Sequence, residues 1–199
     1  MKLRFPWMSS ADRRKWAAAC TLLDLSHLTA AWLEGTIQSQ PGYQPRYGPD
    51  DETLPYVPVL ASVNRAGFLT GFSQPGLTSA DGTWLQAAAV EGVVADSALL
   101  EQLTESARRA GLQVILSNLR DGGEDYGPGV VVTFRDGDPF TRVGRALSLQ
   151  DLDVLWHGVP VARDIVARAR QVTVIEPDFG PSTRLWDVLA EAAAHPVGR

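Results

Sequence analysis

Cysteine and lysine are nearly missing from this sequence. Cys20 is the single cysteine, which excludes an internal disulfide and argues against a metal site built from cysteines. Lysine occurs only at positions 2 and 15, and every other basic side chain apart from three histidines is arginine, a bias that we attribute to codon usage in a GC-rich genome. With so few cysteines and histidines, the sequence alone indicates no nucleophilic or metal-binding set.

Long apolar runs and a strong charge of one sign are missing as well. No apolar stretch approaches the ~20 residues that cross a bilayer, and Met1 to Arg4 is not followed by the apolar core of a signal peptide. The net charge is -5 over 199 residues, and no basic stripe offers the phosphate contacts that nucleic-acid binding requires. We therefore expect a cytoplasmic protein with no nucleic-acid and no membrane partner.

Motifs for phosphoryl transfer and dinucleotide binding are not recognisable. The glycines near position 125 lack Rossmann or P-loop spacing, and Asp178-Phe179-Gly180 occurs without the other kinase motifs. Glu176 and Asp178 form a carboxylate pair, but at the expected end of a strand such pairs are more often turn or capping residues than a cation site. The sequence therefore predicts no catalytic residue and no metal site.

Apolar periodicity predicts helices and strands without strict alternation, which is typical of an α+β or mixed α/β fold. We expect a mixed β-sheet core with surrounding helices in a single compact domain, large enough for a sizeable core. The longest helix is expected from about Ala11 to Glu34, capped by Ser9 or Ser10 and ended by Gly35. The other expected helices are 54–66, 96–110, 149–156, 161–169 and 183–194, and the expected strands are 68–72, 84–94, 112–118, 130–134, 140–143 and 172–175.

Pro41 to Asp51 is rich in proline, glycine and tyrosine and predicts a surface loop. Tyr43 and Tyr47 on this loop could cover a ligand as a lid, although an ordinary packed loop explains the same composition. Asp136-Gly137 is a strong hairpin turn between the strands expected at 130–134 and 140–143.

The segment from Glu52 to Pro75 gathers a carboxylate, hydroxyls and the start of a helix in one place. Thr53 is a good N-cap residue for the helix expected at 54–66, whose first amides have no intrahelical partner. Thr70 and Ser73 leave the end of the following strand, next to that helix. Capping and turn chemistry explain these residue types equally well, but their order and spacing resemble a known pattern.

That pattern is found in the C-terminal regulatory domain of eukaryotic-type methylenetetrahydrofolate reductase, in which a Glu-Thr pair precedes a helix ending in Val-Asn-Arg-x-Gly. A Leu-Thr-Ile-Asn-Ser-Gln-Pro motif follows in that family. The present sequence is similar to it at three places, without a gap between the second and the third: Glu52-Thr53, Val63-Asn64-Arg65-Ala66-Gly67 and Leu69-Thr70-x-x-Ser73-Gln74-Pro75.

Further similarities extend the resemblance over most of residues 50 to 194. Residues 84–91, Trp-Leu-Gln-Ala-Ala-Ala-Val-Glu, resemble a strand of that family, and a helix and a Leu-x-Val strand follow in the same order. Near the end of the chain, residues 172–179 and Leu185-Trp186-Asp187-Val188 resemble the family's Val-Asn-Leu-Val-Asp-Asn-Asp-Phe and Leu-Trp-Gln-Val motifs.

The resemblance implies a module that binds S-adenosylmethionine or S-adenosylhomocysteine as a regulatory ligand rather than a catalyst. Reductase activity in that family belongs to a separate flavin-binding barrel, and a barrel of ~250 residues exceeds this chain. Reduction of a folate is therefore not expected, and the implied ligand is an adenosyl compound with no metal.

The residues that the resemblance assigns to the ligand are led by Glu52, Thr53, Thr70 and Ser73. Hydroxyls, amides and a carboxylate suit the carboxylate, ammonium and ribose groups of a sulfonium amino acid. Looser matches add four residues, of which Pro6-Trp7 resembles a linker motif whose aromatic face could stack on adenine: Thr141, Thr133, Pro6 and Trp7.

The sequence departs from that family at three places. Gly71-Phe72 stands where the family has Ile-Asn, the loop after Pro75 is shorter, and residues 8 to 49 have no convincing counterpart. We therefore expect residues 1–49 to form an N-terminal helix and loop extension and residues 50–199 to form the ligand-binding domain, with both parts in one structural unit. The extension could reshape or close the pocket, so the choice of ligand stays open.

Two other hypotheses remain beside that of a non-catalytic sensor. The first is an enzyme that acts on S-adenosylmethionine, for which Glu52 or Glu176 would be the acid–base residue. The second is a protein-interaction module that keeps the fold but binds a partner chain through Trp7, Trp16 and Trp32.

Overall fold

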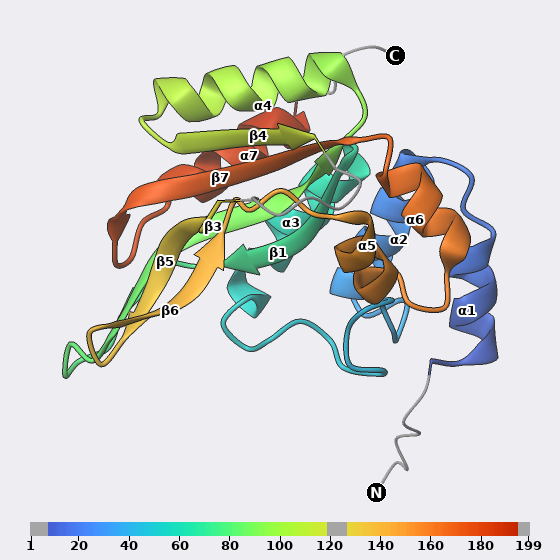
Figure 1. The fold of residues 1–199 in the computed structure, drawn as a ribbon, viewed down its shortest axis with the longest axis horizontal. Helices are drawn as coiled ribbons and strands as arrows, with labels where there is room; N and C mark the ends of the chain where they lie inside the picture. Colours follow the sequence, from blue (N-terminus) through green and yellow to red (C-terminus); the bar gives the residue numbers. More distant parts are fainter. Residues whose placement is uncertain (1–7, 119–126, 195–199) are drawn as a thin grey trace, which may run out of the picture.

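A largely antiparallel seven-stranded sheet lies at the centre of the fold, and helices cover it on one face and at one end (Figure 1). The computed structural model describes residues 8–118 and 127–194. Within these ranges the α-helices are α1 Ser10–Ala17, α2 Leu22–Leu33, α3 Val57–Arg65, α4 Ser97–Arg109, α5 Leu149–Leu155, α6 Pro160–Val166 and α7 Arg184–Ala194. The strands are β1 Phe68–Gln74, β2 Leu77–Thr78, β3 Trp84–Val94, β4 Gln113–Asn118, β5 Val130–Arg135, β6 Asp138–Val143 and β7 Arg170–Phe179.

The 11-residue strand β3 organises the sheet because its two halves have different neighbours. The half from Ala87 to Val94 pairs with β7, and β1 pairs along Ala89 to Val94. The half from Trp84 to Gln86 pairs with β2 and β5. The main strand order is β4-β7-β3-β5-β6, so the α+β fold predicted from the sequence is confirmed.

Two hydrophobic clusters fix the helices to the sheet. The larger one joins α3, α4 and α7 to the sheet through fully buried side chains such as Leu60, Leu103 and Leu189. The second joins α1, α2, α5 and α6 at the other end of the molecule, around Trp16 and Leu152. Residues before position 50 take part in both clusters, so the N-terminal segment packs as part of the same core.

The prediction of a single long helix from Ala11 to Glu34 is wrong, because the helix is interrupted between α1 and α2. Thr21 and Asp24 form a capping box, in which Asp24 N donates to Thr21 Oγ1 (3.1 Å) and Thr21 N donates to Asp24 Oδ2 (2.9 Å). This capping box starts a second helix within the stretch whose apolar residues recur at helical spacing. The longest helix is therefore α4, with 13 residues.

The helix expected at 54–66 begins differently from the prediction. A short 3₁₀ helix, η1 Leu54–Tyr56, precedes α3, and Pro55 and Pro58 each occupy a first-turn position of one of these elements. The Thr53 side chain makes no capping hydrogen bond, so its expected capping role is wrong. A proline at the start of each element is tolerated because its missing N–H needs no partner there.

The other expected elements are confirmed with shifted ends. Trp84–Val94 agrees in full, and the hairpin turn falls at Asp136 and Gly137, which both have positive φ. Strand β7 is ten residues long where four were expected, so Glu176 and Asp178 lie within it rather than after it. Strand β2 was not expected at all.

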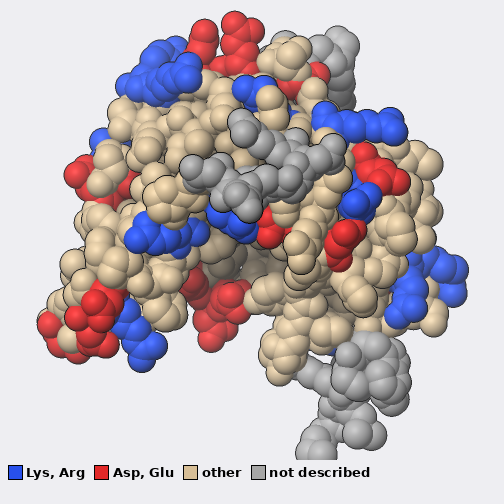
Figure 2. Space-filling view, viewed as in Figure 1, with Lys and Arg blue, Asp and Glu red and all other residues tan. Residues whose placement is uncertain are grey.

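Surface features bear on the partner hypotheses. On the face seen in Figure 2, acidic and basic side chains are interspersed. Trp16 is fully buried and Trp32 is 8% exposed, so neither contributes to the tryptophan-rich surface required by the interaction-module hypothesis. Among the described helices, none combines the length and the apolar character needed to cross a membrane.

Candidate functional site

Five of the eight residues predicted for the ligand line one pocket of about 290 Å³, called here the polar pocket. They come from three parts of the chain: the segment entering η1, strand β1 and strand β6. Helix α2, the loop before η1 and strand β3 complete the wall. The five residues are Glu52, Thr53, Thr70, Ser73 and Thr141.

A β-bulge in β1 explains why Thr70 and Ser73 face the same pocket. The register runs from Thr70 opposite Gly92 to Phe72 opposite Glu91, which leaves Gly71 as the extra residue. Ser73 then lies opposite Val90, two residues from Gly92. Because side chains alternate along a strand, the bulge brings two residues that are three apart onto one face of the sheet.

Asn64 on α3 holds Thr70 in place. Its Nδ2 donates to Thr70 Oγ1 (2.7 Å) and to Leu60 O (2.8 Å), and its Oδ1 accepts from Thr70 N (3.1 Å). Asn64 is fully buried, so these bonds are shielded from water. Since Thr70 Oγ1 already accepts one hydrogen bond, its hydroxyl hydrogen is available to donate to a ligand.

Glu52 is positioned at the pocket by Gln86 of β3. Gln86 Nε2 donates to Pro75 O at 2.8 Å and lies 3.4 Å from Glu52 Oε2, while Gln86 Oε1 accepts from Trp84 Nε1 at 3.1 Å. Gln86 is 2% exposed and Glu52 is exposed. The Glu52 carboxylate therefore keeps most of its hydrogen-bonding capacity for a solute in the pocket.

Thr133 does not line the polar pocket. It is fully buried on β5, where its hydroxyl donates to Gln74 Oε1 at 3.2 Å. Gln74 Nε2 in turn donates to Ala87 O (2.7 Å) and Val132 O (3.1 Å). Thr133 thus supports the wall of the pocket by fixing the end of β1 against β5. Pro6 and Trp7 lie outside the described residues.

Aromatic side chains line two sides of the polar pocket. The Trp84 and Phe140 rings are tilted against each other at 5.3 Å, and Arg135 Cζ lies 5.8 Å from both ring centroids. Phe140 is 58% exposed, so its ring offers free apolar surface. Such a surface suits the face of a planar base.

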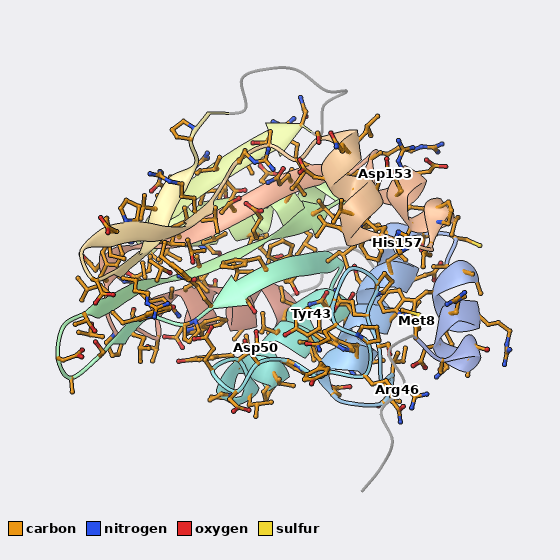
Figure 3. All side chains as sticks on the ribbon, turned by 60° about the horizontal axis from the view of Figure 1, so that its bottom comes forward. Met8, Tyr43, Arg46, Asp50, Asp153 and His157 are labelled. Carbon is orange, nitrogen blue, oxygen red and sulfur yellow. The ribbon has the colours of Figure 1, made fainter. Side chains whose placement is uncertain are left out.

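The loop between α2 and η1 borders the polar pocket through Tyr43 and Asp50, which face each other below β1 (Figure 3). Tyr43 Oη donates to Asp50 Oδ1 at 2.8 Å, and the Tyr43 ring packs edge-on against Trp32 at 5.3 Å. Burial, together with the Asp50 carboxylate, raises the pKa of Tyr43 to about 12. Tyr47 contributes its carbonyl, which accepts from Trp32 Nε1 at 3.0 Å. The loop is therefore anchored to α2.

Two buried polar atoms in the wall of the polar pocket have no hydrogen-bond partner within the described structure. They are Thr29 Oγ1 on α2, a residue that is 1% exposed, and Gln40 Oε1 on the loop. An unpaired buried polar atom is costly, so a ligand or water that satisfies it is favoured. Sequence reasoning missed both residues because neither belongs to a motif.

The remaining candidates lie elsewhere. Glu176 is 1% exposed on β7, forms an ion pair with Arg184 and accepts from Ser182 Oγ at 3.0 Å. It does not line the polar pocket, so it is not the acid–base residue of an enzyme acting there. No three His, Cys, Asp or Glu side chains of residues 8–118 and 127–194 come together as metal ligands would.

Comparison with known proteins places the chain in one family. A family model described as a domain of unknown function, DUF6919, matches residues 11–196. The match covers the N-terminal helices α1 and α2 and the loop after them as well as residues 50–194. The family model therefore treats the N-terminal extension and the following part as one unit. The chain therefore belongs to the DUF6919 family. Among curated proteins no sequence matches it.

Proposed function

We propose that this member of the DUF6919 family binds S-adenosylmethionine or S-adenosylhomocysteine in the polar pocket, as a non-catalytic sensor or regulatory module. The observation that carries the proposal is the convergence of Glu52, Thr53, Thr70, Ser73 and Thr141 on one cavity. These residues were selected from their resemblance to the regulatory domain of methylenetetrahydrofolate reductase.

The chemistry of the pocket supports a ligand with several polar groups. Hydroxyls of Thr29, Thr70, Ser73 and Thr141 line it together with the Glu52 carboxylate. A sulfonium amino acid offers an ammonium, a carboxylate and two ribose hydroxyls to such a set. The exposed ring of Phe140 and the neighbouring Trp84 offer a surface for adenine.

The charge of the pocket favours a cationic ligand. Asp50 and Glu52 line it, and its described lining residues include neither lysine nor arginine. The Arg135 guanidinium lies outside this lining, 5.8 Å from the Trp84 and Phe140 ring centroids. S-adenosylmethionine carries one net positive charge at neutral pH, whereas S-adenosylhomocysteine carries none. Nearby carboxylates stabilise the charged ligand more than the neutral one. We therefore propose tighter binding of the methylated compound.

The experiment is calorimetric titration of the purified protein with each compound, repeated on Thr70→Ala and Ser73→Ala. Removing one hydrogen bond to a polar ligand should weaken binding about tenfold. Thr36→Ala and Ser62→Ala are matched controls, because both residues are exposed and lie outside the polar pocket. Both controls should retain the affinity of the unmodified protein.

Chromatography of the ligand after the titration separates a sensor from an enzyme. Recovery of intact ligand is expected for the sensor. Conversion of the ligand would instead favour an enzyme with Glu52 as its acid–base residue. Absence of heat with both compounds at millimolar concentration would contradict the ligand assignment altogether.

A further inference from the structure

A second cavity of about 280 Å³, called here the apolar cavity, adjoins the polar pocket. The two have in common the lining residues Gln40, Tyr43, Thr70, Gly71 and Phe72. Leu69 and Val93 form its wall on the sheet, and Leu152, Leu155, Trp156 and Val166 form its wall on α5 and α6. In the register of β1, Leu69 and Phe72 lie on the face opposite to Thr70 and Ser73. Glu52, Thr53, Ser73 and Thr141 line the polar pocket but not this cavity, whereas Thr70 lines both.

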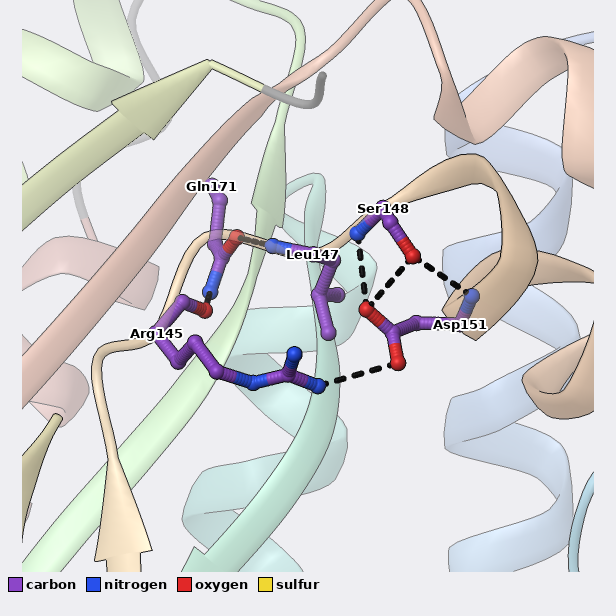
Figure 4. A network of polar contacts seen from close by, with 5 residues as sticks. All are labelled: Arg145, Leu147, Ser148, Asp151 and Gln171. Carbon is purple, nitrogen blue, oxygen red and sulfur yellow. Dashed lines mark hydrogen bonds and ion pairs between the residues drawn. The ribbon is translucent and has the colours of Figure 1, made fainter. Parts of the chain in front are cut away.

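Helix α5 is held firmly at its start, so the cavity has a defined wall (Figure 4). Ser148 and Asp151 form a capping box, and Asp151 Oδ1 lies 2.9 Å from an Arg145 guanidinium nitrogen. Gln171 of β7 accepts from Leu147 N and donates to Arg145 O, both at 2.8 Å. Leu147, which also lines the cavity, is thereby tied to the sheet.

The apolar cavity is larger than the voids of an ordinary packed core, and it is partly open to the surface. Native interiors are packed densely, with few voids larger than a water molecule. An engineered apolar cavity of roughly 150 Å³ stays dry and binds benzene. A cavity of about 280 Å³ therefore has room for a molecule larger than one six-membered ring.

Aromatic and aliphatic side chains dominate the cavity wall, with Tyr43, Phe72 and Trp156 as its aromatic members. Two long polar side chains also line it. Glu91 Oε2 accepts from Gly144 N and from Thr173 Oγ1, both at 2.7 Å, so this oxygen is already hydrogen-bonded within the protein. Gln40, which lines both cavities, carries a buried Oε1 atom without a hydrogen-bond partner in the described structure.

We propose that the apolar cavity is a second ligand site, which takes a small, uncharged, aromatic molecule with one N–H or O–H group. The rings fill the space between β1 and α5, and the N–H or O–H donates to Gln40 Oε1. A ligand of this kind satisfies the unpaired acceptor and leaves no charge in an apolar wall. A charged adenosyl compound does not meet these conditions, so the two cavities select different ligands.

Calorimetric titration of the full chain with indole and 1-methylindole tests the proposal. The two probes are both bicyclic and uncharged, but the second lacks the N–H donor. Saturable binding of indole is expected, with about fivefold weaker binding of 1-methylindole because one hydrogen bond is lost. Equal affinity for both probes, or no binding of indole at millimolar concentration, would overturn the proposal without any variant being made.

The variants Gln40→Leu and Thr29→Val test which side chain accepts the hydrogen bond from the indole N–H. Gln40→Leu should abolish the difference between the two probes, because no acceptor remains. Thr29→Val is the matched control, since it removes the other unpaired atom, which lines the polar pocket and not the apolar cavity. It should preserve the fivefold preference for indole, and a loss of that preference would contradict the assignment.

Repeating the indole titration with saturating S-adenosylmethionine tests whether the two sites are separate. Indole is expected to bind alongside it, and displacement of indole would overturn the second site. The probe titrations stand by themselves if no adenosyl compound binds, so failure of the adenosyl assignment and failure of this proposal remain distinguishable.

Discussion

The two cavities beside β1 have nearly equal volumes, about 290 and 280 Å³, but different chemistry. The first has hydroxyls and carboxylates beside aromatic rings, and the second has mainly aliphatic and aromatic side chains with Glu91 and Gln40 among them. They share the β1 bulge and the loop residues Gln40 and Tyr43. A single irregular strand and one loop thus separate two environments in which different forces govern binding. Charge and hydrogen bonds dominate in the first, and burial of apolar area dominates in the second.

The largest effect is expected from Gly92→Val, which should destroy the wall common to both cavities. A Cβ at this position would lie 2.2 Å from Leu69 O and 2.9 Å from Thr70 Cα, and these backbone atoms cannot move without breaking the pairing of β1 and β3. The free energy of unfolding should fall by about 3 kcal/mol or more, measured by urea denaturation. Gly71→Ala is the control, because nothing lies within 4 Å of its Cβ and its stability should be nearly unchanged. Equal losses in both variants would contradict the shared-wall account.

Leu152→Ala should act on the apolar cavity alone. Leu152 is fully buried in the cluster around Trp16, so its truncation should cost about 2.5 kcal/mol of unfolding free energy. The affinity for S-adenosylmethionine should stay within twofold, because Leu152 does not line the polar pocket. Val154→Ala on the same helix, at a residue that is 67% exposed, should change neither quantity. A tenfold loss of adenosyl affinity in Leu152→Ala would show that the cavities are not independent.

Glu52→Gln should act on the polar pocket alone. It removes a carboxylate while keeping the shape of the side chain, so binding of S-adenosylmethionine should weaken about fivefold. Binding of S-adenosylhomocysteine should weaken less, since that ligand has no net charge. The neighbouring Asp51→Asn is the control, because Asp51 is exposed and does not line the polar pocket. If both substitutions weaken both ligands equally, the charge-based preference is wrong.

The smallest effect concerns Tyr43, which borders both cavities. Its pKa in the folded state is raised to about 12 from 10.0, first by burial and then by Asp50. A raised pKa contributes stability that is fully present below pH 10 and is lost as the pH rises towards 12. The melting temperature of the unmodified protein should therefore fall more than that of Tyr43→Phe between pH 10 and 12. Parallel curves for the two proteins would contradict the raised pKa of Tyr43.

The sequence predicted the polar pocket better than the apolar cavity, for a physical reason. Motif residues such as Glu52, Thr70 and Ser73 carry distinctive polar groups at recognisable spacing. The apolar cavity is built from Leu152, Val166 and similar side chains, which look like any core residue in one dimension. A void between packed helices depends on tertiary geometry, which periodicity does not encode.

Local irregularities were also hidden from the sequence. The bulge at Gly71 places Thr70 and Ser73 on one face, although strict alternation would separate them. The capping box at Thr21 and Asp24 divides a continuous apolar period into two helices. In both places a local hydrogen-bonding pattern changes the structure that the spacing of apolar residues predicts. The sequence alone does not show which of the two determines the local structure.

The most direct measurement is a heteronuclear NMR titration of labelled protein with S-adenosylmethionine. We predict saturable shifts of the amides of Glu52, Thr53, Ser73 and Thr141, with the amides of Leu152 and Val166 unmoved. Subsequent addition of indole should move that second group and leave the first in place. Absence of shifts at the polar pocket with millimolar S-adenosylmethionine, or shifts confined to the apolar cavity, would contradict the assignment of the adenosyl site.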